Sequence, residues 1–286
     1  MTAALWTLSL ATGIAVGAGS YALFLSMPES WIRDDEPGLE PVAPLPKPRL
    51  RFLPFGLLWV LACVVLSVQS FSTPADGWVA ALCVLALVPL SVVFVSDCLT
   101  RIIPDQAVVA LAVIGVLFWG LGLVPSLSGA LPGMLPNGAP WYLEVVNRIG
   151  AALTGGLLLL AVGWIGSRMA GGAEAMGMGD VKLLAAIGLV SGALGLLAVL
   201  LVAFVTGAVF ALPALVRKYR SRPIPPAASY PLPPDGLLPP DGSLPPTENL
   251  QDGTMPFGPF LVLGLLAVLF FSNQLQAVAA WYLTTF

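Results

Sequence analysis

Long apolar runs, separated by polar or proline-rich stretches, dominate the chain. An α-helix needs about 20 apolar residues to cross roughly 30 Å of hydrocarbon. Runs of about that length or longer lie near 3–26, 53–71, 78–96, 106–124, 149–169, 194–216 and 257–283, and a shorter apolar run covers 181–191. The pattern therefore predicts an all-α integral membrane protein with about eight transmembrane helices.

The composition supports a membrane protein. Hydrophobic residues make up 58% of the chain and charged residues only 9%, with a mean hydropathy of +0.93, whereas about a quarter of the residues of soluble domains are charged. The net charge of −3 gives no reason to expect a nucleic-acid partner. The chain has no histidine and three separate cysteines, so we expect no metal site, cofactor or disulfide framework.

The distribution of cations predicts the orientation in the membrane, because Lys and Arg concentrate in cytoplasmic loops. If the N-terminus lies outside, eleven of the twelve cations fall on the cytoplasmic side and only Arg148 falls on the other. The eleven are Arg33, Lys47, Arg49, Arg51, Arg101, Arg168, Lys182, Arg217, Lys218, Arg220 and Arg222. This alternation requires the short run 181–191 to cross the membrane.

The loops suggest two regions. Residues 1–52 combine a first span, retained because no basic segment precedes it, with a short cytosolic loop. Residues 53–286 form the remaining membrane core. Within that core, residues 222–253 repeat a Leu-Pro-Pro-Asp-Gly pattern with a period of six, which favours a polyproline tether in the cytosol over a packed domain. The loop 125–147 is interpreted as an external connector.

Two acids stand at the ends of apolar runs and are the candidate catalytic residues. Asp97 ends the third span and Asp180 begins the short sixth span, and the predicted topology places both at the cytoplasmic face. An acid at membrane depth is costly and indicates function. Two carboxylates in a low-dielectric cleft cannot both ionise cheaply and share a proton, as in aspartic proteases. Alternatively, each acid caps a helix or pairs with a nearby cation. For Asp105 in a first helical turn, we favour this second interpretation.

Three segments in order resemble the type IV prepilin peptidases, a family of polytopic aspartic proteases. Gly177-Met178-Gly179-Asp180 is similar to their GxGD signature, and Asp97 matches their first catalytic aspartate. Met255-Pro256-Phe257-Gly258-Pro259 is similar to the segment that opens their last span. The resemblance covers roughly residues 53–283. Before it, residues 19–28 are similar to a degenerate copy of the family's first-span segment.

The resemblance implies a GxGD-type peptidase that cleaves the leader peptides of type IV prepilins or pseudopilins at the inner face of a bacterial inner membrane, in pilus assembly or type II secretion. Asp97 and Asp180 would be catalytic. Gly177, Gly179, Lys182, Pro256, Phe257, Gly258 and Pro259 would support the substrate and the loop. The zinc-binding cysteines of bifunctional members are missing from the short 27–52 loop, so N-methylation of the product is an open question.

Two alternatives from other classes are kept. A proton- or cation-coupled transporter would use the same acids as a relay and predicts ionisable residues at mid-span on several helices. A pilus or secretion assembly protein without catalysis needs neither aspartate. The sequence leaves the oligomeric state and the individual substrate open.

Overall fold

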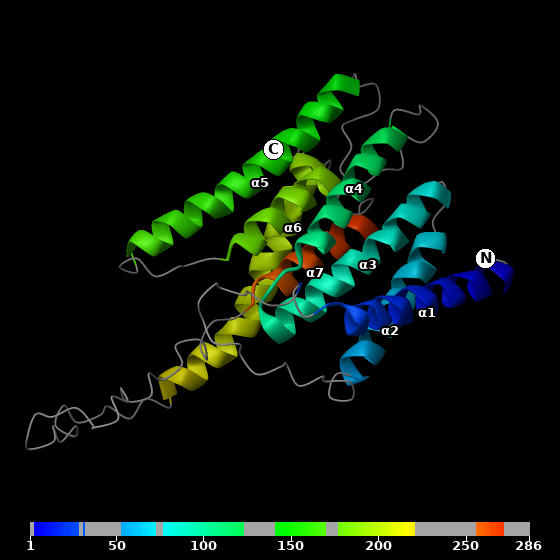
Figure 1. The fold of residues 1–286 in the computed structure, drawn as a ribbon, viewed down its shortest axis with the longest axis horizontal. Coiled ribbons are helices and arrows are strands. Elements are labelled where there is room, and N and C mark those ends of the chain that lie inside the picture. The colour runs from blue at the N-terminus through cyan, green and yellow to red at the C-terminus, as the bar shows by residue number, and fades with distance from the viewer. Residues whose placement is uncertain are drawn as a thin grey trace, which may run out of the picture.

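The computed structural model describes residues 3–28, 31, 53–72, 77–122, 141–169, 177–220 and 256–271, and these contain helices and no strand. The proline-rich segment 222–253, Glu174 and most of the 27–52 loop lie outside the described residues. The helices are α1 (Ala3–Ser26), α2 (Leu53–Ser72), α3 (Gly77–Thr100), α4 (Asp105–Gly122), α5 (Trp141–Met169), α6 (Met178–Arg220) and α7 (Gly258–Phe270). Figure 1 shows them as one helical assembly.

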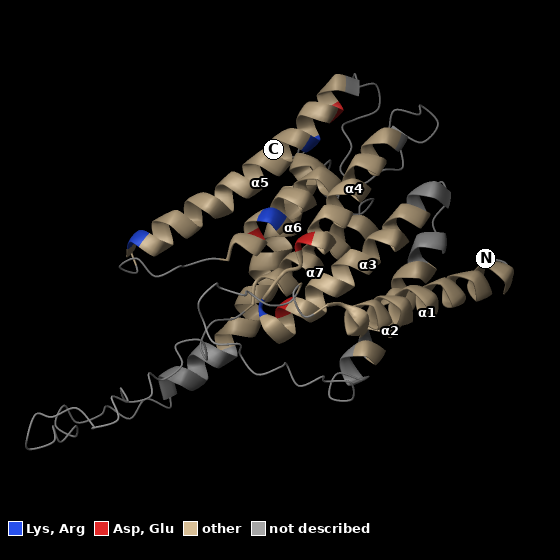
Figure 2. Cartoon of the chain, in the orientation of Figure 1, with Lys and Arg blue, Asp and Glu red and all other residues tan. Residues whose placement is uncertain are grey.

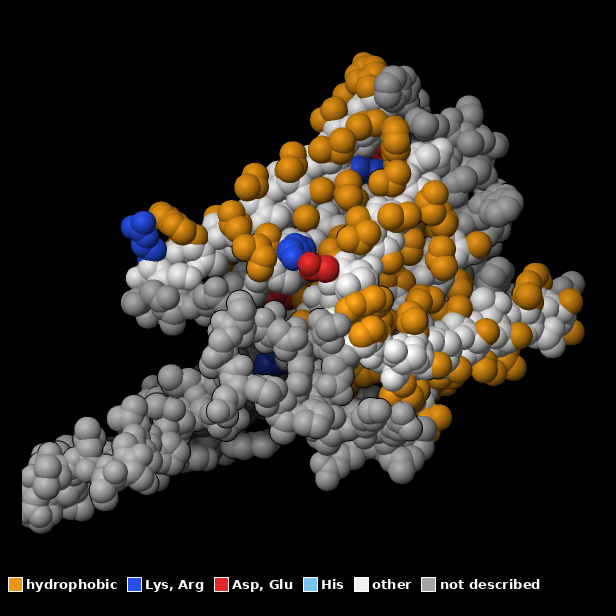
Figure 3. Space-filling view, viewed as in Figure 1, with side chains coloured by type: hydrophobic (Ala, Val, Ile, Leu, Met, Phe, Trp, Pro, Cys, Tyr) orange, Lys and Arg blue, Asp and Glu red, His pale blue; other side chains and the backbone are white. Residues whose placement is uncertain are grey.

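Four of these helices are long and apolar enough to cross a membrane: α1, α3, α5 and α6. The described parts of α2, α4 and α7 are apolar but shorter. Hydrophobic side chains also cover much of the face seen in Figure 3, which is typical of a surface in contact with lipid tails. The all-helical membrane fold expected from the sequence is confirmed at this level.

The helix α5 begins at Trp141, eight residues before the predicted span at 149–169. This helix includes the polar residues Glu144, Asn147 and Arg148. Glu144 and Arg148 are buried and form an ion pair of 2.8 Å. The connector predicted for 125–147 is therefore helical from residue 141 onward, because these polar groups find partners inside the protein.

The helix α6 consists of two arms that meet at Gly192, where φ is 64° and ψ is −178°. This backbone conformation is readily accessible only to glycine. The second arm returns alongside the first: Asp180, in the first turn, lies near Asp97, and the ring of Phe204, on the second arm, lies 5.9 Å from that of Phe257 beside α7. Figure 1 shows the chain turning back between the two arms. The sequence placed a break between 191 and 194, and the structure has it there.

The centre of the fold is formed by α3, α6 and α7. The helix α7 is buried along most of its length, including Leu261, Val262 and Leu265, and it packs between α3 and α6. The helices α1 and α2 pair and lie against α3, whereas α5 lies along α6. Consequently the C-terminal end of α3, the N-terminal end of α6 and the N-terminal end of α7 meet at one end of the bundle.

Candidate active site

Asp97 lies in the last turn of α3 and is only 4% exposed. The chain leaves the helix sharply after it, because Arg101 adopts a left-handed conformation with φ of 59°. The buried hydroxyl of Ser96 donates to the carbonyl of Ile102 at 2.6 Å, and Thr100 Oγ1 donates to the carbonyl of Ser96 at 2.9 Å. These two hydroxyls hold the turn that follows Asp97. In the sequence, neither hydroxyl is distinguished by more than its place within three residues of Asp97.

Asp180 lies in the first turn of α6, partly buried, directly after the two motif glycines. Its carboxyl is close enough to that of Asp97 for the two charges to act on each other. Asp97 Oδ2 and Asp180 Oδ1 are both buried, and neither has a hydrogen-bond partner among the described residues. A buried polar oxygen without a partner is costly. The structure thus brings the two predicted acids together and leaves one oxygen of each available.

The N-terminal end of α7 completes the site. A Cβ atom built on Gly258 would lie 2.6 Å from Asp97 Oδ2, and the backbone amide of Gly258 faces the Asp97 carboxyl. Pro259 is in the first helical turn, where an N–H group would have no intrahelical acceptor. Phe257 precedes the helix, and its ring contacts Phe204 of α6. Pro256 lies just before Phe257, half-buried.

One side chain, Ile103, links the three parts of the site. A Cβ atom on Gly179 would lie 3.1 Å from Ile103 Cβ, and one on Gly258 would lie 3.3 Å from Ile103 Cδ1. The two glycines therefore let α6 and α7 close on the same buried isoleucine of the α3–α4 turn. Gly177, by contrast, is exposed, and a Cβ atom added to it would have no neighbour within 4 Å among the described residues. Ile103 has no signal in the sequence beyond its place before Pro104.

Lys182 forms an ion pair with Asp105 of α4. Its Nζ donates to Asp105 Oδ1 at 2.8 Å and to Asp105 Oδ2 at 2.9 Å. Asp105 is in the first turn of α4, as expected, and the pair ties α4 to α6 on the surface. Figure 2 shows charged residues gathered where α3, α4 and α6 come together, with others toward the ends of α5. Lys182 is thus engaged by a neighbouring helix.

Removing the Lys182–Asp105 pair is expected to have a small effect, because the two side chains are 48% and 62% exposed and exposed pairs contribute about 0.2–1 kcal/mol. Asp105→Asn should lower the free energy of unfolding by that amount and leave the fold around Asp97 and Asp180 unchanged. Denaturant unfolding in detergent, run as a double-mutant cycle with Lys182→Gln, measures the coupling. The coupling should disappear at high salt; a coupling that persists there would contradict this account.

The described residues contain no group of three or more His, Cys, Asp or Glu side chains placed to share a metal ion. The site consists instead of two acids, three close-packed backbone segments and the aromatic ring of Phe257. Two carboxyls that share a proton can act as a base and an acid in the same step. The arrangement suits proton transfer to and from a substrate held against the two acids.

Residues 83–212 match the family model described as the type IV leader peptidase family. Over these residues, the chain is therefore similar to the type IV leader peptidase family. The matched segment contains both Asp97 and Asp180 and extends from the first half of α3 to the second arm of α6. The residues around Gly258 lie outside it and are joined to the site by contact alone.

Curated proteins named prepilin leader peptidase/N-methyltransferase are also similar to the chain. The protein of Xanthomonas campestris pv. campestris is 28% identical over 219 residues, which cover 77% of this chain and 58% of that protein. That of Aeromonas salmonicida is 32% identical over 171 residues, covering 59% and 51%, and that of Aeromonas hydrophila is 29% identical over 231 residues, covering 79% and 60%. The chain thus spans little more than half the length of these relatives. No solved structure matches it.

Proposed function

We propose that the protein is a membrane aspartic endopeptidase that removes the leader peptides of type IV prepilins or pseudopilins. The observation that carries this proposal is the meeting of Asp97 and Asp180, from helices far apart in the sequence, with a buried, unpartnered oxygen on each. The family of residues 83–212 and the names of the similar proteins point to the same activity.

In the proposed reaction, the two carboxyls hold one proton between them. The ionised carboxylate takes a proton from a water molecule, which attacks the scissile carbonyl carbon, while the protonated carboxyl donates its proton toward the carbonyl oxygen. Collapse of the tetrahedral intermediate then transfers a proton to the leaving amine. Gly177 is exposed and leaves room for a substrate backbone beside these groups, whereas Gly179 and Gly258 let α6 and α7 pack closely enough to hold the two acids in place.

We place the site at the cytoplasmic side of a bacterial inner membrane, with the N-terminus in the periplasm and eight spans in all. The reversal at Gly192 supports this count, since it divides α6 into two arms that run in opposite directions. The first arm, Met178 to Ser191, is about 21 Å long at 1.5 Å per residue, shorter than the hydrocarbon layer. Asp180 would therefore lie just inside the membrane boundary, where a basic leader in the cytosol meets an apolar stem.

The transporter and assembly alternatives have less support. A relay predicts unpaired ionisable groups along several spans. The buried Glu144–Arg148 pair on α5 is ionisable, yet its two members bind each other and the backbone of α6. An assembly protein without catalysis would have no need for two acids that meet with unpartnered oxygens. N-methylation of the product is not part of this proposal, because the 27–52 loop holds none of the cysteines associated with that activity.

The test is co-expression with a prepilin in a bacterial host that lacks its own prepilin peptidase. A shortened pilin on a gel, with the new N-terminus identified by mass spectrometry, is the expected result. The same spectrum shows whether that N-terminus carries a methyl group. If the protein reaches the membrane in full and prepilins and pseudopilins of several systems all keep their leaders, the proposed function is wrong.

A further inference from the structure

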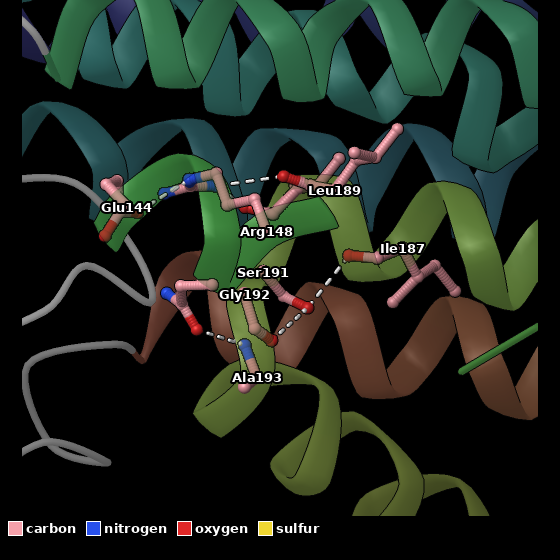
Figure 4. Close-up of polar contacts among 9 residues, drawn as sticks. Glu144, Arg148, Ile187, Leu189, Ser191, Gly192 and Ala193 are labelled. Atoms are coloured by element: carbon pink, nitrogen blue, oxygen red, sulfur yellow. Dashed lines mark hydrogen bonds and ion pairs between the residues drawn. The ribbon is translucent and has the colours of Figure 1, made fainter. Parts of the chain in front are cut away.

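The reversal at Gly192 breaks the hydrogen-bond ladder of α6 inside the protein. The last carbonyls of the first arm lose their helical donors, and the first amides of the second arm lose their helical acceptors. In a membrane, water is not present to replace them, so each such group needs a partner within the protein. Side chains of α5 supply partners for Leu189, Val190 and Ala193, while the hydroxyl of Ser191 on α6 itself donates to the carbonyls of Ile187 and Gly192 (Figure 4).

Arg148 satisfies the end of the first arm. Its Nη1 donates to the carbonyl of Leu189 at 3.0 Å and to the carbonyl of Val190 at 2.5 Å. Its Nε donates to Glu144 Oε1 at 2.8 Å. Arg148 is 2% exposed and Glu144 is 5% exposed. A cation at the C-terminal end of a helix is also favoured by the helix dipole, so the guanidinium suits this position in both charge and geometry.

Asn147, the neighbour of Arg148, satisfies the start of the second arm. Its Oδ1 accepts a hydrogen bond from the amide of Ala193 at 3.0 Å, in the manner of a helix cap supplied by another helix. The three residues Glu144, Asn147 and Arg148 therefore hold both sides of the break from one turn of α5. We refer to them as the α5 clamp.

Close packing between α5 and the first arm of α6 continues beyond the α5 clamp, toward Asp180. A Cβ atom on Gly188 would lie 2.6 Å from the backbone of Ala151, so the two helices touch at this point. From Gly192, the first arm runs about 18 Å to Asp180 at 1.5 Å per residue. A small change in direction at the break therefore moves the carboxyl of Asp180 relative to Asp97, which is held on α3.

We propose that the α5 clamp is a positioning device: Glu144, Asn147 and Arg148 keep the two arms of α6 folded back and so hold Asp180 beside Asp97. The part that concerns activity rests on the proposed function, while the part that concerns the fold of α6 does not. Arg148 is thus a buried structural cation. This structural role explains why Arg148 is the one cation that the predicted topology does not put on the cytoplasmic side.

The fold of α6 is tested by a distance measurement. Spin labels are placed at two exposed positions, Met178→Cys on the first arm and Val205→Cys on the second, after replacement of the three native cysteines. Double electron–electron resonance in lipid nanodiscs should give one narrow distance distribution. Glu144→Gln with Arg148→Gln removes both charges together and leaves no lone buried ion; it should broaden the distribution toward longer distances.

Milder variants keep the test decisive if that double variant fails to insert. Asn147→Ala removes only the cap on Ala193 and should broaden the distribution less. Arg148→Lys keeps a cationic donor and should partly restore the narrow distribution relative to Arg148→Gln. Arg168→Gln is the matched control on α5, since Arg168 lies over the Trp164 ring at the other end of the helix; it should change nothing.

Prepilin cleavage by unlabelled protein supplies the second measurement. The double variant should lower kcat about tenfold with KM nearly unchanged, because it misplaces one reacting group and leaves the substrate surface intact. A double variant with the narrow distribution and kcat of the parent overturns the proposal. If the parent cleaves no prepilin, the proposed function fails, and the distance distribution alone then decides whether the α5 clamp holds the arms of α6.

Discussion

Replacing Asp180 with Asn is expected to abolish leader cleavage while the protein still inserts and folds. Asn has nearly the same shape as Asp, yet it can neither take up nor release the shared proton. Positioned acid–base groups contribute up to about 10⁴-fold to a rate, and the loss here should reach at least about 10³-fold. The measurement is the initial rate of prepilin shortening at matched amounts of membrane-inserted enzyme.

Asp97→Asn should produce the same loss, and the double variant should be no worse than either single one, because the two acids act as a unit. Asp105→Asn is the control: it removes an acid eight residues further along the chain, at the start of α4, that is already paired with Lys182. A variant of Asp97 or Asp180 that inserts, folds and cleaves at the parent rate would show that the pair is not catalytic.

Burial of the pair also predicts that these two substitutions do not destabilise the protein greatly. A carboxyl at low dielectric carries a desolvation cost that Asn avoids, and no described hydrogen bond is made by Asp97 Oδ2 or Asp180 Oδ1. Loss of activity without loss of folded protein would therefore separate a catalytic role from a structural one.

Much of the membrane fold is visible in the sequence because the bilayer imposes a simple rule: a span needs a long apolar run. That rule found α1 and α3 within a few residues, and it located the break in α6 near Gly192. It placed the start of α5 eight residues too late, because Glu144 and Arg148 interrupt the apolar run before residue 149. Their charges are accepted inside the protein only because they meet each other and the open end of the first α6 arm.

The candidate site could be predicted in its chemistry and only partly in its geometry. Asp97 and Asp180 stand out as acids at the edges of apolar runs, and the alternation of spans put them on one side. The partner of Lys182 could not be foreseen, because Asp105 lies 77 residues away in the sequence. Ile103 was equally hidden, since an isoleucine beside apolar neighbours has no distinguishing pattern until Gly179 and Gly258 pack against it.

A single methyl group added at Gly258 is expected to disturb the pair of acids directly. A Cβ atom there would lie 2.6 Å from Asp97 Oδ2 and 3.1 Å from Asp97 Cγ, closer than atoms of these kinds approach. Either the Asp97 carboxyl or the first turn of α7 must move. Both are buried against neighbours, so the strain falls on the pair of acids.

Gly258→Ala should therefore lower kcat about 100-fold, since a displacement of about 1 Å at a reacting group has an effect of that size. Gly207→Ala on α6 is the matched control, because its added methyl would meet only the Phe260 ring at 3.6 Å, an ordinary contact. Cleavage rates and thermal unfolding of both variants are compared with the parent. If Gly258→Ala cleaved at the parent rate, α7 would not press on Asp97, and its N-terminal end would have no part in the active site.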